Sequence, residues 1–432
     1  MSADASWSFD TKQIHAGAAP DPATGARATP IYQTTSYVFR DTQHGADLFS
    51  LAEPGNIYTR IMNPTQDVLE QRLAALEGGV AAVAFASGSA ATTAAILNLA
   101  NSGDHVVASP ALYGGTYNLL RYTLPKLGLQ VTFVDDQDDL EAWRAAARPN
   151  TKLFFAETLA NPGSNVLDVR GVADVAHEVG VPLVVDNTVP TPFLLRPIEH
   201  GADIVVHSAT KYLGGHGTTV AGVVVDGGTF DFGTERFPGF NEPDPSYNGL
   251  QFWPALGPGA YAAKLRVQLL RDTGAAIAPL NSFLILQGIE TLSLRMERHV
   301  ANAQALAEWL QQRDEVEAVY YAGLPSSRWY DAAKKYLPNG AGAVVSFDLR
   351  GGVDAGRAFV DGTELFSLLV NIGDVRSLIT HPASTTHSQL SPEELLASGV
   401  TPGLIRLAVG LEGIEDLKAD LEAGFRAAKS AL

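Results

Sequence analysis

The sequence has no cysteine among its 432 residues. This absence excludes disulfide bonds, thiolate nucleophiles, cysteine-ligated zinc and iron–sulfur clusters, because each of these needs a thiol. No stretch reaches the roughly 18 consecutive apolar residues that a membrane-spanning helix requires. The first residues, from Met1 to Trp7, lack the basic and apolar segments of a secretory signal. We therefore expect a cytoplasmic protein with no membrane partner.

Positive charge is also in short supply. The chain has 30 Lys and Arg residues against 47 Asp and Glu residues, so its formal net charge is −17. Such a field repels nucleic acids, and we expect no nucleic-acid partner. It would also repel an anionic cofactor or substrate, so single arginines within motifs, here Arg60 and Arg406, become informative. A hydrophobic content of 46% and a charged content of 18% are typical of a globular protein.

What the sequence does contain is a regular alternation of apolar strand candidates with helical stretches. The candidates cover residues 81–86, 105–108, 130–134, 152–156, 181–185, 203–207 and 220–225. Alternation of this kind predicts βαβ units and a mostly parallel sheet, which is an α/β fold. Ligands of such sheets bind at the carboxyl ends of the strands. Ser87, Glu157, Asp186 and Ser208 all fall at these ends.

Three regions are expected along the chain. Residues 1–62 show no sustained helical or strand period and predict an extended arm. Residues 63–280 hold the strand candidates and form the α/β domain. Residues 281–432 begin with a helical segment from about 284 to 310 and predict a smaller α+β domain. Residues 231–260, rich in Pro, Gly and aromatics, are either a structured insertion near the site or a connector.

Two strand ends carry a pair of reactive groups. The candidate at 203–207 is followed by Ser208, Thr210 and Lys211, and the candidate at 181–185 is followed by Asp186. A lysine amine among apolar strand ends should have a lowered pKa and can form a Schiff base with a phosphorylated aldehyde. A buried carboxylate can hold the proton on a pyridine nitrogen. Each residue alone is commonly a solvated loop residue, but together they indicate pyridoxal phosphate.

Other residues could complete a cofactor site. Ser87, Gly88 and Ser89 lie between a strand and an expected helix, where backbone N–H groups suit a phosphate, although small residues there also permit close packing. Tyr113 could lay its ring over a pyridine, and Asn161 could hydrogen-bond the ring oxygen. A tyrosine in a loop is more often there for packing, and the Asn-Pro dipeptide favours a turn on its own, so neither residue indicates a site without Lys211.

These residues together resemble a known family. The segments 87–88, 157–162, 186–188 and 208–212, with Tyr113, are similar to the cysteine/methionine-metabolism branch of fold-type I pyridoxal-phosphate enzymes. The likeness covers almost the whole chain. It implies a large, mostly parallel sheet domain flanked by helices, a smaller C-terminal α+β domain, pyridoxal 5′-phosphate as the cofactor and no metal.

The resemblance also implies roles for residues outside the strand ends. Tyr58 and Arg60 are expected to reach a neighbouring subunit's phosphate site, within a homotetramer whose active sites are shared. Arg406 is expected to bind the substrate's α-carboxylate, because a guanidinium pairs bidentately with a carboxylate. Tyr58 and Tyr113 are candidates for stacking or proton handling beside Lys211, and the sequence does not separate their roles.

Asn371 and two further segments, 241–247 and 290–299, resemble the O-acetylhomoserine sulfhydrylase branch. This likeness implies γ-replacement on O-acetyl-L-homoserine by sulfide or a thiol, giving L-homocysteine and acetate in methionine biosynthesis, with Asn371 in the substrate site. A methionine or cystathionine γ-lyase and a cystathionine γ-synthase stay open as alternatives. A non-catalytic cofactor carrier would leave Arg406 and Tyr113 unexplained. A nicotinamide site fails, because residues 87–89 lack the G-x-G-x-x-G spacing.

Overall fold

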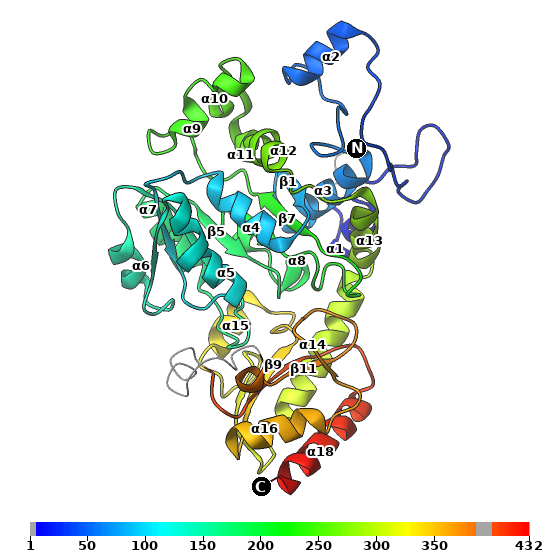
Figure 1. Ribbon diagram of the computed structural model, residues 1–432, viewed down its shortest axis with the longest axis vertical. Helices are drawn as coiled ribbons and strands as arrows, with labels where there is room; N and C mark the ends of the chain where they lie inside the picture. Colours follow the sequence, from blue (N-terminus) through cyan, green and yellow to red (C-terminus); the bar gives the residue numbers. More distant parts are fainter. Residues whose placement is uncertain (1–5, 386–399, 432) are drawn as a thin grey trace.

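The computed structural model describes residues 6–385 and 400–431. The first five residues of the expected arm and two parts of the expected second domain, 386–399 and 432, lie outside it. Two sheets lie one above the other along the long axis of the molecule (Figure 1). The upper sheet has seven strands and the lower sheet has five. A continuous cluster of buried apolar residues extends from one face of the upper sheet to the lower sheet and includes Val205 and Phe347.

The seven-stranded sheet is mostly parallel, as the sequence predicts. Its strand order is β1-β7-β6-β5-β4-β2-β3, with bounds β1 Ala81–Phe85, β2 His105–Ala108, β3 Gln130–Phe133, β4 Thr151–Glu157, β5 Leu183–Asp186, β6 Ile204–His207 and β7 Gly222–Asp226. The central strands are buried, as expected for apolar runs that do not alternate. Only β7 runs antiparallel to its neighbours β1 and β6. A turn rather than a crossover helix joins β6 to β7, so the chain reverses direction.

Helices cover both faces of this sheet. Residues of α3 (Pro64–Glu77) and α7 (Val169–Glu178) pack on one face, and those of α4 (Gly88–Leu97) and α11 (Ala260–Lys264) pack on the other. The remaining short helices of this part are α5 Gly114–Asn118, α6 Leu140–Ala146 and α8 Thr191–Leu194. The start of α3 is fixed by Asn63, whose side-chain oxygen accepts from the Thr65 N–H at 2.9 Å. The helix ends at Gly78, whose φ of 82° suits glycine.

The N-terminal segment differs from the prediction that it lacks helices. It contains α1 (Phe9–His15) and α2 (Thr42–Phe49), and Figure 1 shows α2 standing away from the sheet. Both helices are too short to give a sustained period in the sequence. The start of α2 is set locally, because the Asp41 carboxylate accepts from the His44 N–H at 2.8 Å.

The segment 231–260 is a structured insertion. It holds α9 (Pro238–Asn241) and α10 (Phe252–Leu256) and continues into α11, a π-helical turn at Leu265–Leu270 and α12 (Arg271–Thr273). Its aromatic side chains pack together, with the rings of Phe232 and Phe240 stacked at 4.7 Å between centroids. This cluster gives the insertion an apolar core of its own against α4 and the sheet.

The five-stranded sheet is mostly antiparallel, with the order β10-β11-β12-β9-β8. Its strands are β8 Val316–Tyr320, β9 Val344–Leu349, β10 Ser367–Leu368, β11 Leu378–Thr380 and β12 Leu404–Ala408. The helices of this part of the chain are α13 Pro279–Ile289, which packs on α3, and α14 Leu292–Leu310, α15 Tyr330–Tyr336, α16 Gly352–Asp361 and α18 Ile414–Ser430. The predicted helical segment at 284–310 is therefore two helices with a break at Glu290–Thr291. Among the described residues, no helix is both long and apolar enough to cross a membrane.

Candidate functional site

A cavity of about 290 Å³ opens at the carboxyl ends of β1, β4, β5 and β6. It gathers every predicted site residue except Tyr58 and Arg60: Ser87, Gly88, Ser89, Tyr113, Asn161, Asp186, Ser208, Thr210, Lys211, Asn371 and Arg406. Glu157 and Thr188 line it as well. The rim of the parallel sheet supplies most of these side chains, and the second sheet supplies Arg406.

Lys211 lies in the turn that follows β6. Its amine donates a hydrogen bond to the side-chain oxygen of Asn371. Burial lowers the pKa of Lys211, and the nearby positive charge of Arg406 lowers it further. This direction agrees with the sequence-based expectation and favours a neutral amine that can act as a nucleophile or accept a proton.

The turn that carries Lys211 is held from behind by α14. The Arg295 guanidinium donates from Nη1 to the Tyr212 carbonyl at 2.7 Å and from Nη2 to the Leu213 carbonyl at 3.3 Å. Gly215 has a φ of +74°, and a Cβ added there would lie 2.2 Å from Arg295 Nη1. Only glycine fits beside this guanidinium. The turn after Lys211 is thus shaped by a helix of the second sheet.

Two carboxyl groups form the floor of the cavity. Glu157 at the end of β4 and Asp186 at the end of β5 are partners in the strand register. Burial raises the pKa of Asp186, opposed by hydrogen bonds from Thr188, whose N–H donates at 2.9 Å. Burial and the charge of Asp186 raise the pKa of Glu157 well above its usual value. Asp186 is consequently the better site for a negative charge.

The start of α4 offers backbone donors to the cavity. The Ser87 hydroxyl accepts from the Ala90 N–H at 3.1 Å and so caps the helix. The N–H groups of Gly88 and Ser89 belong to the first turn, where a helix leaves them without internal partners. A Cβ on Gly88 would lie 2.6 Å from the Ser208 Cβ, so a side chain does not fit there. Because Gly88 and Ser89 line the cavity and Gly88 has no side chain, their N–H groups can bind an anion there.

Buried polar atoms without partners also line the cavity. The side-chain oxygen of Asn161 and Nε of Arg406 make no hydrogen bond to the described protein. Arg406 Nη2 donates to the Asn371 carbonyl at 3.1 Å and to the Thr380 hydroxyl at 3.3 Å. Burying a polar group unpaired is costly, so these atoms indicate groups that a bound molecule would satisfy. With the amine, the paired carboxyls and the helix start, the cavity fits pyridoxal phosphate and an amino-acid carboxylate.

Tyr58 and Arg60 lie elsewhere on the surface of the chain. The Tyr58 side chain is 40% exposed, and the Arg60 guanidinium lies 5.4 Å from the centre of its ring. Arg60 also donates to the Arg271 carbonyl. Arg271 Nη1 in turn lies 2.7 Å from the hydroxyl oxygen of Tyr247, in the insertion. The structure therefore brings this part of the arm beside the insertion rather than into the Lys211 cavity of the same chain.

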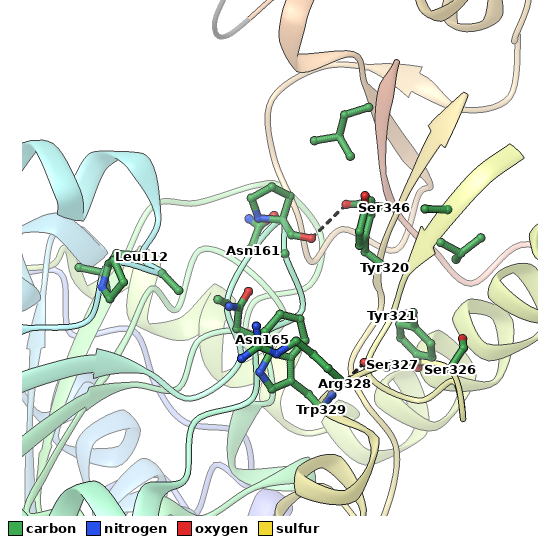
Figure 2. Close-up of a pocket in the computed structure, with 18 of the residues that line it drawn as sticks. Leu112, Asn161, Asn165, Tyr320, Tyr321, Ser326, Ser327, Arg328, Trp329 and Ser346 are labelled. Carbon is green, nitrogen blue, oxygen red and sulfur yellow. Dashed lines mark hydrogen bonds between the residues drawn. The ribbon is translucent and has the colours of Figure 1, made fainter. Parts of the chain in front are cut away.

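A larger cavity of about 740 Å³ lies next to the first, between the loop after β4 and the second sheet. Asn161 lines both cavities, and Figure 2 shows it on one wall with Ser346 of β9 opposite. The Ser346 hydroxyl donates to the Pro162 carbonyl at 3.1 Å. Arg328, which also lines this cavity, is paired with Asp138 at 2.6 Å. These bonds join the two sheets beside the site and leave Arg328 engaged.

Two site residues, Glu157 and Arg295, have roles that the sequence does not indicate. Glu157 was placed at a strand end, but its pairing with Asp186 depends on the strand register. Arg295 lies far from Lys211 in the sequence and within a helix, where nothing in the local pattern marks it. The strand-end rule could have identified Glu157, whereas no sequence signal identifies Arg295.

Comparisons with known proteins agree with the predicted family. The family model described as Cys/Met metabolism PLP-dependent enzyme matches residues 10–426. The chain is 56% identical to the O-acetyl-L-homoserine sulfhydrylase of Leptospira meyeri over 426 residues, which is 96% of each chain. It is 54% identical to the homocysteine synthase of Schizosaccharomyces pombe over 417 residues, covering 95% of this chain and 96% of that one.

A solved structure shows the same fold. The crystal structure of a putative O-acetylhomoserine (thiol)-lyase from Campylobacter jejuni, which contains N′-pyridoxyl-lysine-5′-monophosphate, superposes with a TM-score of 0.93. It is 41% identical, and the match covers 97% of this chain and all of that chain (100%). The predicted fold type and the predicted cofactor are confirmed. The chain belongs to the Cys/Met metabolism family of PLP-dependent enzymes, and its cofactor is pyridoxal 5′-phosphate.

Proposed function

We propose that this enzyme replaces the acetate of O-acetyl-L-homoserine with sulfide or a thiol, giving L-homocysteine and acetate. The observation that carries an amino-acid substrate is the half-buried Arg406, which lines the same cavity as Lys211 and whose buried Nε has no partner among the described residues. The choice of substrate is supported by relatives of matching length that are named O-acetyl-L-homoserine sulfhydrylase. Methionine biosynthesis is the pathway that this product would serve.

The cofactor would be held by residues of the sheet rim. In this proposal Lys211 binds its aldehyde carbon, and Asp186 carries the negative charge opposite its ring nitrogen. The N–H groups of Gly88 and Ser89, with the hydroxyls of Ser87, Ser208 and Thr210, would hold the phosphate. The ring of Tyr113 would lie over the pyridine, and Asn161 would bond the ring oxygen. The bound cofactor supplies an electron sink that weakens bonds at the substrate's α-carbon.

The chain's own groups would place the substrate and move its protons. Arg406 pairs with the α-carboxylate and so orients the α-hydrogen toward Lys211. Once the substrate's amine has replaced Lys211 on the aldehyde carbon, the freed Nζ, with its lowered pKa, accepts that proton and can return it at the neighbouring carbon. Asn371, which accepts a hydrogen bond from the amine, keeps Nζ directed into the cavity. Tyr113 shields one side of the reacting atoms from water.

The neighbouring subunit is part of the proposal. Tyr58 and Arg60 would complete the phosphate site of a second copy, within a homotetramer. The arm presents exposed apolar side chains that support a protein partner, including Val38 at 97% and Phe49 at 60% exposure. The division into an arm (1–62), a cofactor domain (63–280) and a C-terminal domain (281–432) belongs to the same proposal. The cytoplasmic location stays a prediction that cell fractionation would test.

The activity is tested by following products. Purified enzyme is incubated with O-acetyl-L-homoserine, with and without sulfide, while acetate, homocysteine and ammonia are measured. We expect homocysteine and acetate in equal amounts only when sulfide is present. Release of ammonia and an oxoacid from methionine or cystathionine at a higher kcat/KM would instead establish a lyase. Lys211→Ala should lose both the cofactor's imine absorbance and turnover.

The shared site is tested by mixing two inactive variants. Lys211→Ala lacks the amine, and Arg60→Ala lacks the proposed phosphate contact. Mixed subunits would regain activity, because one kind of site in a mixed dimer then has both Lys211 and Arg60. Light scattering reports whether the assembly is a tetramer. No recovery on mixing, with exchange of subunits verified by mass, would mean that Arg60 acts within its own chain.

A further inference from the structure

Two carboxyl groups, one buried and one half-buried, lie on neighbouring strands at the Lys211 cavity. Glu157 and Asp186 end neighbouring parallel strands and are directly paired in the register. Adjacent strands lie about 4.8 Å apart, and paired side chains point to the same side of the sheet. Glu157 is only 5% exposed, and both side chains line the cavity. One of these carboxyl groups, Asp186, has a role in the proposed site, and the other has none so far.

On neighbouring strands in a poorly solvated place, a negative charge on one carboxyl group disfavours a negative charge on the other. Both groups accept a backbone N–H, but Asp186 has the stronger support for its charge, because the Thr188 side chain and the nearby His207 also favour its ionised form. Burial and the charge of Asp186 both raise the pKa of Glu157. The proton therefore stays on Glu157, and the single negative charge of the pair stays on Asp186.

The hydrogen bonds of Glu157 lead to the walls of the cavity. Its Oε1 accepts from the Tyr113 N–H at 2.5 Å, directly before α5. The Asn161 N–H, on the loop after β4, lies near enough to the same carboxyl group to oppose the rise of its pKa. A carbonyl oxygen of an uncharged acid accepts such bonds as well as a carboxamide does. One buried side chain thus links the backbones of the two residues that would flank the cofactor ring.

We propose that Glu157 is an uncharged positioning residue that holds Tyr113 and Asn161 against the cofactor while it leaves the charge on Asp186. This inference rests on the proposed cofactor site around Lys211. Glu157 itself forms no covalent bond and transfers no proton. It sets where the ring of Tyr113 lies, and this ring is 55% exposed in the chain described here.

Cofactor binding to the apo-protein separates an uncharged acceptor from a charged one. Glu157→Gln keeps an oxygen acceptor without a charge, and it should bind pyridoxal phosphate within about threefold of wild type with an unchanged visible circular dichroism band. Glu157→Ala leaves the Tyr113 N–H unpaired, and it should raise the Kd for the cofactor about tenfold and alter that band. If Glu157→Ala does not fold, Glu157→Asp takes its place in the test. It keeps the acid but withdraws its oxygens, so it should show the higher Kd and the altered band expected of the alanine variant.

Two results would overturn the inference. If Glu157→Gln weakens cofactor binding as much as Glu157→Ala, the charge of Glu157 matters and the residue is not neutral. If Glu157→Ala or Glu157→Asp binds the cofactor with wild-type affinity and circular dichroism, Glu157 positions nothing. The Lys211→Ala spectrum is read separately. Imine absorbance that survives in Lys211→Ala would refute the proposed site itself, whatever the Glu157 variants do.

Discussion

The two sheets contribute to the site in different ways. The parallel sheet presents Asp186 and Lys211 at or just after the carboxyl ends of β5 and β6. The antiparallel sheet presents Arg406 from the middle of β12, where it is paired with Ser346 and Thr380 of the neighbouring strands. In the proposed enzyme the first sheet binds the cofactor and the second binds the substrate's carboxylate. The two binding functions should therefore be separable by single substitutions.

The largest effect should come from the parallel sheet. Asp186→Asn removes the charge opposite the ring nitrogen, so the cofactor becomes a weaker electron sink. We expect kcat to fall at least about 10²-fold, as for other buried electrostatic groups of active sites. Steady-state kinetics measure the loss, with Glu157→Gln on the adjacent strand as the matched control. An equal fall of kcat in both variants would show that the two carboxyl groups do not differ in role.

A substitution in the antiparallel sheet should leave the cofactor intact. Arg406→Lys keeps a positive charge but loses the planar fork that pairs with a carboxylate. We expect KM for O-acetyl-L-homoserine to rise about 10- to 100-fold, the size of a lost charged hydrogen bond, with the visible spectrum unchanged. Arg350→Lys, an arginine just after β9, serves as the control and should behave as wild type. A cofactor that dissociates from Arg406→Lys would contradict the division between the sheets.

The sheets also influence each other through charge. Burial lowers the pKa of Lys211, and the Arg406 charge adds to this effect. Removing that charge in Arg406→Gln should raise the pKa of Lys211, so the reactive neutral amine forms only at higher pH. The rate at which the apo-protein forms its imine with pyridoxal phosphate should then fall severalfold at neutral pH and recover in alkaline buffer. Stopped-flow absorbance across this range measures the shift, and an unchanged profile would show that burial alone sets the pKa.

The smallest effect concerns stability, away from the chemistry. His299 in α14 is buried and donates from Nδ1 to the Val409 carbonyl at 2.6 Å, while Nε2 has no partner among the described residues. Burial lowers the pKa of His299 from 6.5 to about 4. The unfolded chain takes up this proton first, so stability is full above pH 6.5 and is lost as pH falls toward 4, by roughly 3 kcal/mol at most. Denaturant unfolding of His299→Asn should show a shallower loss over this interval, and an equal slope would contradict the assignment.

The sequence predicts the parallel sheet better than the second one. Long apolar runs that end in Ser208 or Asp186 mark both the strands and the rim, so the cofactor residues follow from the strand-end rule. β10, with two residues, and β11, with three, are too short to produce a pattern. The position of Arg406 beside Lys211 came only from the resemblance, because antiparallel packing between distant segments leaves no local signal. The break between α13 and α14 falls at Glu290 and Thr291, and neither residue is a Pro or Gly that would mark it in the sequence.

Arg295 constrains how the enzyme can move. Its hydrogen bonds fasten the backbone just beyond Lys211 to α14. A hinge between them would break buried contacts of a charged group. We therefore expect Lys211 to keep its position while exposed side chains that line the cavity, such as Val370 at 59% exposure, move to admit a substrate.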